Sequence, residues 1–147
     1  MVKLKETKKF TLTVEGETEK WYFEWLEKLI NTNEDAEYKV SIIAKVQQNP
    51  SKFAKSQTSF STPTIVHICD VESNEPVHKK KFLCILDQID SANKLGKRIK
   101  YNLGYSNFTF ELWIALHKVN CNGPLTNRSQ YITHINRAFG ENFEDLD

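Results

Sequence analysis

Three carboxylates follow two apolar, strand-like runs of the sequence, and these residue types suit metal-dependent phosphate chemistry. Glu15 ends the run FTLTVE, and Asp70 ends the run PTIVHICD, with Glu72 two residues beyond it. In an open parallel sheet, functional groups collect outside the carboxyl ends of the strands. If the two strands are neighbours, the carboxylates meet at one edge, where their mutual repulsion favours a bound cation. The pattern predicts a site for Mg²⁺ or Mn²⁺, which take oxygen ligands and can polarise a phosphoryl oxygen or supply a bound hydroxide.

A glycine and a lysine close to Glu15 suit a phosphate ligand. Gly16 directly follows the strand, where a residue without a side chain lets the backbone turn sharply and a ligand come close. The helix expected after it offers unpaired N–H groups and the positive end of its dipole to an anion. Lys20, one turn into that helix, is expected to meet a phosphate. The alternatives are an ordinary Glu-Gly turn and, at Asp-x-Glu, a solvated loop with capping acids.

The elements that must position these residues alternate along the chain. Strands are predicted at 9–15, 37–44, 63–70 and the beginning of 97–106, and helices at 17–31, 49–60, 78–95, 107–119 and 128–139. Strands alternating with helices predict an α/β fold, with a mostly parallel four-stranded sheet flanked by helices. The length predicts one domain over residues 1–147. Its ending, FGENFEDLD, shows no obvious helix stop, so we expect a carboxyl-terminal part to be missing.

The net charge, the cysteines and the absence of certain motifs limit the partners, the compartment and the chemistry that the sequence predicts. The net charge is +1, so any nucleic-acid surface must be a local patch, such as His78 with the three lysines that follow it. Three cysteines without a secretory signal predict a reduced, cytoplasmic protein. No apolar stretch approaches the roughly 20 residues of a membrane span. Zinc-ligand spacing, a phosphate-binding loop and a serine–histidine–aspartate arrangement are not visible, which excludes those classes.

The segments VEGETEKWYF, HICDVES and YSNFTFELWIALHKV carry a resemblance over nearly the whole chain. The first two resemble the TOPRIM domain, the fold shared by topoisomerases, bacterial primases and OLD-family nucleases. That family has Glu-Gly after its first strand and Asp-x-Asp after its third. The opening and the third segment are similar to RloB-like proteins, TOPRIM proteins of bacterial restriction and abortive-infection loci. The resemblance therefore implies a TOPRIM-like fold.

Carried onto this sequence, the resemblance assigns the acidic residues. Glu15 matches the TOPRIM glutamate, a metal ligand or general acid/base, and Asp70 and Glu72 match the pair that binds Mg²⁺. Two positions depart from the pattern. Glu72 replaces an aspartate and is one methylene longer, which alters where its carboxylate reaches. Phe108 replaces the proline that follows Ser-Asn in the family, so the backbone entering the next helix is expected to differ.

Three residues of the third segment are expected to bind substrate: Ser106, Asn107 and Glu111. Asn107 is equally explained as the N-cap of the helix predicted at 107–119. Glu111 aims at the acidic edge or, alternatively, holds a basic partner in a buried network. His67, inside the strand predicted at 63–70, is expected to be a core residue.

The resemblance implies a Mg²⁺-dependent nuclease that hydrolyses phosphodiester bonds of DNA or RNA in anti-phage defence. Asp70 and Glu72 would hold the metal, Glu15 would share it or activate a water, and Lys20 would offset transition-state charge. A partner ATPase is implied as well. The alternative is a catalytically inactive module that binds nucleic acid or the ATPase. A third hypothesis is nucleotidyl transfer, as in primases.

Overall fold

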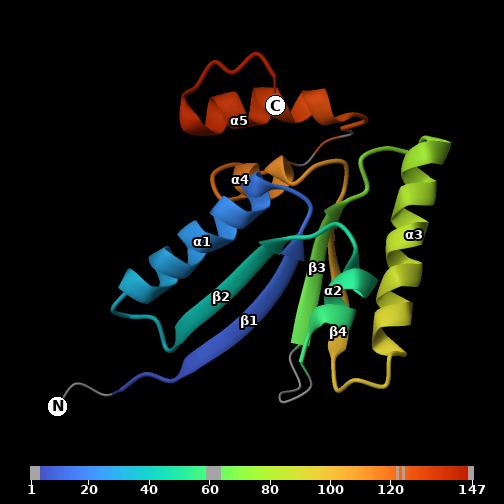
Figure 1. Ribbon diagram of the computed structural model, residues 1–147. Helices are drawn as coiled ribbons and strands as arrows, with labels where there is room; N and C mark the ends of the chain where they lie inside the picture. The colour runs from blue at the N-terminus through green and yellow to red at the C-terminus, as the bar shows by residue number, and fades with distance from the viewer. Residues whose placement is uncertain (1–3, 59–63, 122, 124, 146–147) are drawn as a thin grey trace. The chain divides into compact units, whose positions relative to one another are not determined.

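The computed structural model describes residues 4–58, 64–121, 123 and 125–145, and it confirms the α/β prediction. Four strands form one parallel sheet in the order β2-β1-β3-β4 (Figure 1). The strands are β1 (Thr7–Val14), β2 (Lys39–Val46), β3 (Thr64–Asp70) and β4 (Lys100–Ser106). The helices are α1 (Glu17–Thr32), α2 (Pro50–Ser56), α3 (Pro76–Asn93), α4 (Glu111–Leu116), the short 3₁₀ helix η1 (Arg128–Gln130) and α5 (Tyr131–Phe139).

The chain divides into two compact units. Unit 1 comprises Met1–Ile68 and Ile85–Gly104, and unit 2 comprises Cys69–Cys84 and Tyr105–Asp147. The division cuts β3, α3 and β4, so the last residues of β3 and β4 belong to unit 2 together with the first half of α3.

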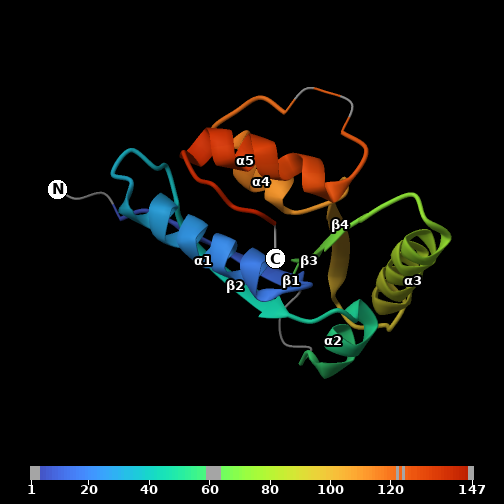
Figure 2. The same cartoon turned by 90° about the horizontal axis from the view of Figure 1, so that it is seen from above.

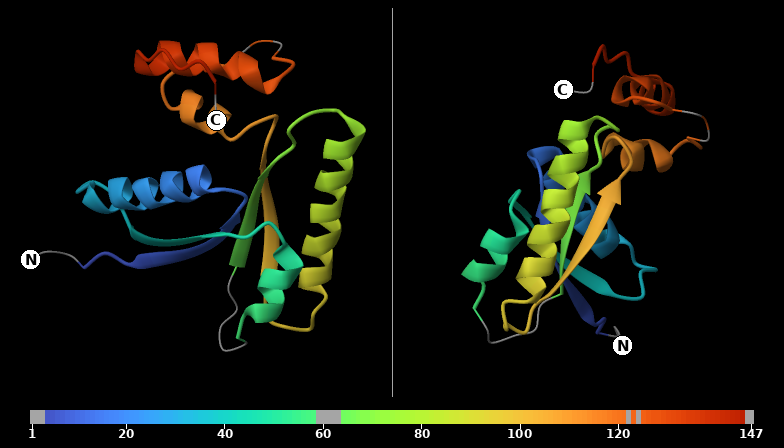
Figure 3. Two further views of the ribbon diagram at one scale, coloured as in Figure 1. Left: turned by 45° about the horizontal axis from the view of Figure 1, so that its top comes forward. Right: turned by 90° about the vertical axis from the view of Figure 1, so that its right-hand side faces the viewer.

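Unit 1 is built around β1. This strand pairs in parallel with all of β2 and, from Thr11 to Val14, with β3. Helix α1 lies along β2 and β1, and the second half of α3 runs beside β3 and β4 (Figures 1 and 3). The apolar core of the unit consists of Leu12, Val14, Phe53, Ala54, Ile65, Ile85, Ile89, Ala92 and Ile99. The interior strands are apolar because helices cover a parallel sheet on its faces.

Side chains of α1 also bond the outer edge of β2, where no further strand of the described residues pairs. Asn31 donates its amide to the Val40 carbonyl at 2.7 Å and accepts the Val40 N–H at 2.8 Å. Glu27 accepts the N–H of Ile42. These bonds satisfy backbone groups that would otherwise be free to recruit another strand.

Local signals in the sequence fix several helix ends. Asn49 caps α2 by accepting the Lys52 N–H at 2.8 Å, and Pro50 takes the first helical position, as predicted. The helix ends at Ser56, and residues 59–60 of the predicted span lie outside the described residues. Gly96 and Gly140 follow α3 and α5 with φ of 71° and 70°, a conformation that favours glycine.

A buried polar chain joins three strands in unit 1. The Thr13 hydroxyl lies 2.9 Å from His67 Nδ1 and 2.7 Å from the Tyr101 hydroxyl, and none of the three residues is more than 2% exposed. This confirms that His67 is a core residue. Because a mispaired strand would leave these polar groups buried without their partners, the chain favours the observed register. Burial raises the pKa of Tyr101 to about 12, and its bond to Thr13 lowers it in part.

We expect Tyr101 to make the protein less stable in alkali. Its folded-state pKa of about 12 exceeds the ordinary value of 10.0, so between these values the unfolded state loses the proton first. The contribution is complete below pH 10 and is lost as the pH rises through 12, by about 3 kcal/mol at most, since each unit of pKa shift corresponds to about 1.4 kcal/mol. Chemical unfolding at a series of pH values measures it.

Tyr101→Phe tests this expectation against Tyr105→Phe, the same change at a tyrosine that is 58% exposed. Near pH 8 we expect Tyr101→Phe to cost about 1 kcal/mol, because Thr13 loses a bonding partner. Above pH 10 its stability should fall less steeply than that of Tyr105→Phe. Equal slopes in the two variants would show that Tyr101 does not cause the alkaline loss.

Unit 2 contains α4 and α5, which pack side by side (Figure 2). Its buried apolar residues are Cys69, Phe110, Ala115, Tyr131 and Ile135. All three cysteines, Cys69, Cys84 and Cys121, are free thiols. In the part of the chain that the structure describes, no helix is both long enough and apolar enough to cross a membrane.

Candidate active site

Two strained turns follow β3 and β4 in unit 2. The Val71 carbonyl accepts the Ser73 N–H at 2.7 Å, and the Asn107 carbonyl accepts the Thr109 N–H at 2.9 Å. The residues between them, Glu72 and Phe108, have φ of 59° and 66°. A bond from residue i to i+2 around a positive φ is typical of the rare, strained form of the γ-turn. Among the described residues, only Glu72 and Phe108 combine a side chain with a positive φ.

The two turns are joined directly. The Val71 N–H donates to the Ser106 carbonyl at 3.0 Å, which connects the residue after β3 to the last residue of β4. Asp70 is the last residue of β3 and is half-buried, while Ser106 is only 2% exposed. Strained backbone is retained at functional sites because the surrounding structure enforces it. The geometry therefore marks the same strand ends that the sequence motifs mark.

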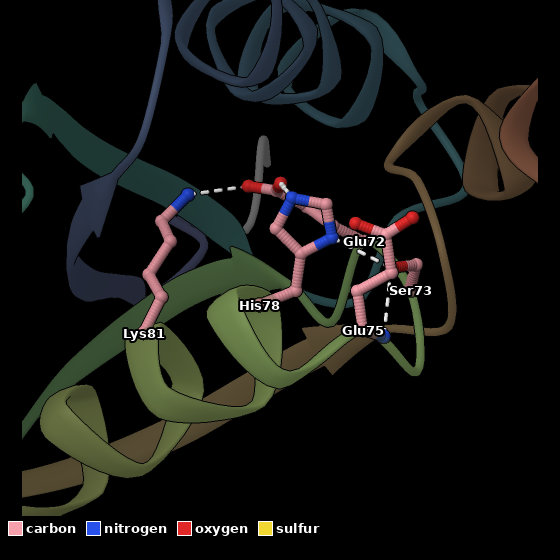
Figure 4. Close-up of polar contacts among 5 residues, drawn as sticks. All are labelled: Glu72, Ser73, Glu75, His78 and Lys81. Carbon is pink, nitrogen blue, oxygen red and sulfur yellow. Dashed lines mark hydrogen bonds and ion pairs between the residues drawn. The ribbon is translucent and has the colours of Figure 1, made fainter.

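Glu72 is surrounded by side chains from α3 and its preceding loop (Figure 4). One carboxylate oxygen, Oε2, lies 3.0 Å from His78 Nε2, and the other, Oε1, forms an ion pair with Lys81. The Ser73 hydroxyl lies 2.6 Å from His78 Nδ1, and its oxygen accepts the Glu75 N–H at 3.1 Å. The left-handed turn at Glu72 thus presents its carboxylate to the first turns of α3.

The hydrogen bond to Glu72 fixes the position of one proton on His78. A carboxylate can only accept, so His78 Nε2 carries the proton that it shares with Glu72. In the neutral imidazole Nδ1 then accepts the hydroxyl proton of Ser73. The sequence analysis missed this cluster. The sequence did contain one indication of the cluster. His78 and Lys81 are three residues apart, which places both on one face of a helix.

Glu111 lies in a separate set of contacts within unit 2. The Thr109 hydroxyl donates to Oε2, and Arg128 donates to Oε1 at 3.4 Å, while the Glu111 side chain is 14% exposed. These contacts match the alternative in which Glu111 holds a basic partner. A contact between Glu111 and the substrate stays a prediction. The nearby Tyr131 hydroxyl donates to the Asn107 carbonyl at 3.5 Å, and burial raises the pKa of Tyr131.

Helix α4 is shorter than predicted. It runs from Glu111 to Leu116 instead of 107–119, its N-cap is Phe110, and no side chain caps it. The prediction of Asn107 as N-cap is therefore wrong. The physical reason is the positive φ of Phe108, which cannot belong to a right-handed helix and forces the helix to begin after it. Asn107 is left exposed in the turn.

In unit 1, Glu15 and Gly16 form the junction between β1 and α1. Glu15 is half-buried, and one of its carboxylate oxygens, Oε1, is fully buried. Gly16 is the N-cap of α1 with an extended φ of −145°, so the turn expected here does not require glycine. A Cβ at this position would lie 3.1 Å from Glu19 Oε2, the end of a flexible side chain.

Lys20 is already engaged on its own helix. Its ammonium lies 3.5 Å from Glu17 Oε2, and Glu17 and Glu19 both occupy the first turn of α1. Acids at this end of a helix offset the positive end of the dipole. A phosphate at the beginning of α1 would therefore compete with two carboxylates of the same turn.

The strands that carry Glu15 and Asp70 are neighbours in the sheet. Within unit 1, Val14 of β1 is the register partner of Ile68 of β3. Glu15 follows Val14 directly, and Asp70 stands two residues beyond Ile68. This adjacency, on which the predicted site depends, is confirmed.

The match to a known family includes all of these residues. The family model described as "RloB-like protein" matches residues 10–146. The chain belongs to the RloB-like family. Neither the curated proteins nor the solved structures contain a match to this RloB-like protein.

Binding of the expected Mg²⁺ depends on which side chains of this RloB-like protein offer oxygen ligands. In the described residues, no three His, Cys, Asp or Glu side chains are grouped so that they could hold a metal ion. Asp70 and Glu15 nevertheless fit Mg²⁺ by type, because each has a carboxylate oxygen, and one oxygen of each is buried. Glu72 could bind the metal only by giving up one of its present partners. One of its carboxylate oxygens contacts His78 and the other contacts Lys81.

Proposed function

We propose that this RloB-like protein is a Mg²⁺-dependent nuclease of the TOPRIM type. It hydrolyses phosphodiester bonds of DNA or RNA in the cytoplasm, in defence against phage and beside a partner ATPase. The observation that carries the proposal is the adjacency of β1 and β3, with Val14 paired to Ile68. Glu15 directly follows β1, and Asp70 is the last residue of β3. The strained turns after β3 and β4 support a site at the same strand ends.

Each residue has a defined part in this hydrolysis. Asp70 and Glu72 would hold the metal, and Glu15 would share it or activate a water. Bound there, Mg²⁺ would withdraw charge from the phosphoryl oxygens and lower the pKa of a coordinated water. Where Glu15 is not a ligand, it accepts the proton of the attacking water as the new P–O bond forms. The bond to the leaving oxygen would then break, and that oxygen would take up a proton from solvent water.

The remaining candidates bind the substrate. Lys20 offsets charge on the phosphate once it releases Glu17, and Gly16 allows close approach of the backbone. Asn107, which is exposed in the turn after β4, supplies an amide in unit 2. Ser106 at the end of β4 supplies a hydroxyl only when the turn opens, because that hydroxyl is buried. Protein groups that favour the transition state over the ground state account for most of such catalysis.

A second candidate function is a binding module without turnover. The pairing of Glu72 with Lys81 and His78 favours it, because a carboxylate neutralised by the protein itself is a poor metal ligand. In this module the fold binds nucleic acid or the ATPase, and metal has no effect on that binding.

A metal-dependent cleavage assay separates the two functions. The protein is incubated with single-stranded DNA, double-stranded DNA, linear single-stranded RNA or transfer RNA. Each substrate is tested with Mg²⁺, with Mn²⁺ and with a chelator. We expect cleavage of at least one substrate with either metal and none with the chelator. Binding that is equal under all three conditions, without cleavage, would support the module. Incorporation of labelled nucleotides would instead indicate nucleotidyl transfer.

A further inference from the structure

The carboxylate of Glu72 has two oxygens with different kinds of partner. Oε2 accepts from the neutral or protonated ring of His78, which itself is bonded to Ser73. Oε1 faces the ammonium of Lys81, a full positive charge on a flexible chain. Lys81 thus occupies a position on Glu72 where a divalent cation would bind.

We propose that Lys81 is an internal counter-ion, which Glu72 exchanges for the divalent metal and which then binds the phosphate of the substrate. The inference rests on the proposed nuclease function and adds a role for Lys81, to which that hydrolysis assigns none. It assigns Lys81 two successive partners, Glu72 in the metal-free protein and a phosphodiester in the metal-loaded one.

The exposure of the pair makes the exchange favourable. The side chains of Lys81 and Glu72 are 44% and 35% exposed, so water screens their attraction. Ion pairs of this kind contribute little to stability, and a divalent cation with several oxygen ligands can replace a single ammonium. The released ammonium keeps three N–H donors, which suit phosphate oxygens.

The other contacts of the cluster keep Glu72 in position during this exchange. His78 holds Oε2, and the turn from Val71 to Ser73 fixes the backbone at its positive φ. The longer side chain also matters, because a glutamate reaches one methylene further towards α3 than an aspartate. Glu72 therefore exchanges one partner at Oε1 and leaves the remainder of the cluster unchanged.

Lys81→Met tests the inference, with Lys80→Met as the matched control. Both remove one lysine charge from the same turn of α3, but among the described residues no ion pair to Lys80 is observed. Mn²⁺ affinity is measured by electron paramagnetic resonance on the whole chain at constant pH. We expect Lys81→Met to bind Mn²⁺ roughly two- to fivefold more tightly than Lys80→Met, the factor that a screened ion pair can supply.

A second measurement follows the phosphate. Binding of a fluorescent single-stranded oligonucleotide is measured with and without Ca²⁺, an oxygen-binding cation that replaces Mg²⁺ for this purpose. We expect Ca²⁺ to strengthen binding in the wild type and in Lys80→Met. The increase should be lost in Lys81→Met, because the coupling between the two ligands passes through this side chain.

The outcomes distinguish the inference from the proposed function. If the wild type binds Mn²⁺ and both variants bind it equally, the inference is wrong and the metal site stands. If neither the wild type nor either variant binds Mn²⁺, both are wrong. Thermal unfolding of each variant shows that the comparison is made between folded proteins.

Discussion

Asp70→Asn is expected to abolish metal-dependent cleavage, with a rate at least about 100-fold below that of the wild type. The substitution keeps the shape of the side chain but removes the negative charge that Mg²⁺ requires, and it replaces one oxygen by an N–H₂ group that cannot coordinate. Asp70 is the last residue of β3, so a strand rather than a flexible loop positions it. Cleavage rates across a range of Mg²⁺ concentrations measure the loss.

The control for Asp70→Asn is Asp87→Asn, the same change at an exposed position of α3. It should leave the cleavage rate and the Mn²⁺ affinity unchanged. Glu15→Gln should resemble Asp70→Asn, while Glu72→Gln should reduce the rate less, because in our inference Glu72 would reach the metal only after it exchanges Lys81. A wild-type rate in Asp70→Asn would remove this residue from the site and leave the proposed nuclease without its principal ligand.

The alternation of apolar strands and helices was sufficient to predict the sheet. The runs that became β1 and β3 are apolar because both strands lie in the interior of a parallel sheet, and that property is visible in the sequence. The Glu-Gly and Asp-x-Glu positions were visible for the same reason, since each stands where an apolar run ends. The strand order did not follow from this pattern, because the adjacency of β1 and β3 was a condition of the predicted site and comes from the structure.

The contacts of Glu72 were not predictable in this way. They depend on the positive φ of Glu72, and nothing in the residue type glutamate indicates a left-handed backbone. The polar chain through Thr13, His67 and Tyr101 was missed for a related reason, because polar residues of separate strands become partners only through the register. In both cases tertiary structure overrides local preference.

Phe108 shows the same limit in the backbone. The helical periodicity of the segment continues through residues 107–119, and it predicted a helix over the whole segment. The γ-turn at Phe108 interrupts that helix, although the sequence contains no glycine there to announce a positive φ. The departure from the proline of the RloB-like pattern was the one available signal, because proline cannot adopt this conformation.

Phe108→Pro should therefore destabilise the protein by about 3 kcal/mol or more, even though it restores the residue that the family pattern carries. The proline ring fixes φ near −65°, whereas the turn requires 66°. To accept proline, the chain must break the bond from the Thr109 N–H to the Asn107 carbonyl and displace Thr109 and Phe110, which are 1% and 3% exposed. Urea unfolding measures the loss.

Two further variants separate the ring of proline from the loss of the phenyl side chain. Phe108→Ala removes the side chain and keeps the strain, while Phe108→Gly removes both. We expect the glycine variant to be about 1 kcal/mol more stable than the alanine variant, since glycine adopts a positive φ without a steric penalty. The proline variant should be the least stable of the three. If it equals the alanine variant, the backbone of this loop moves freely between the two signs of φ, and the strained turn does not constrain the strand ends where the acidic residues lie.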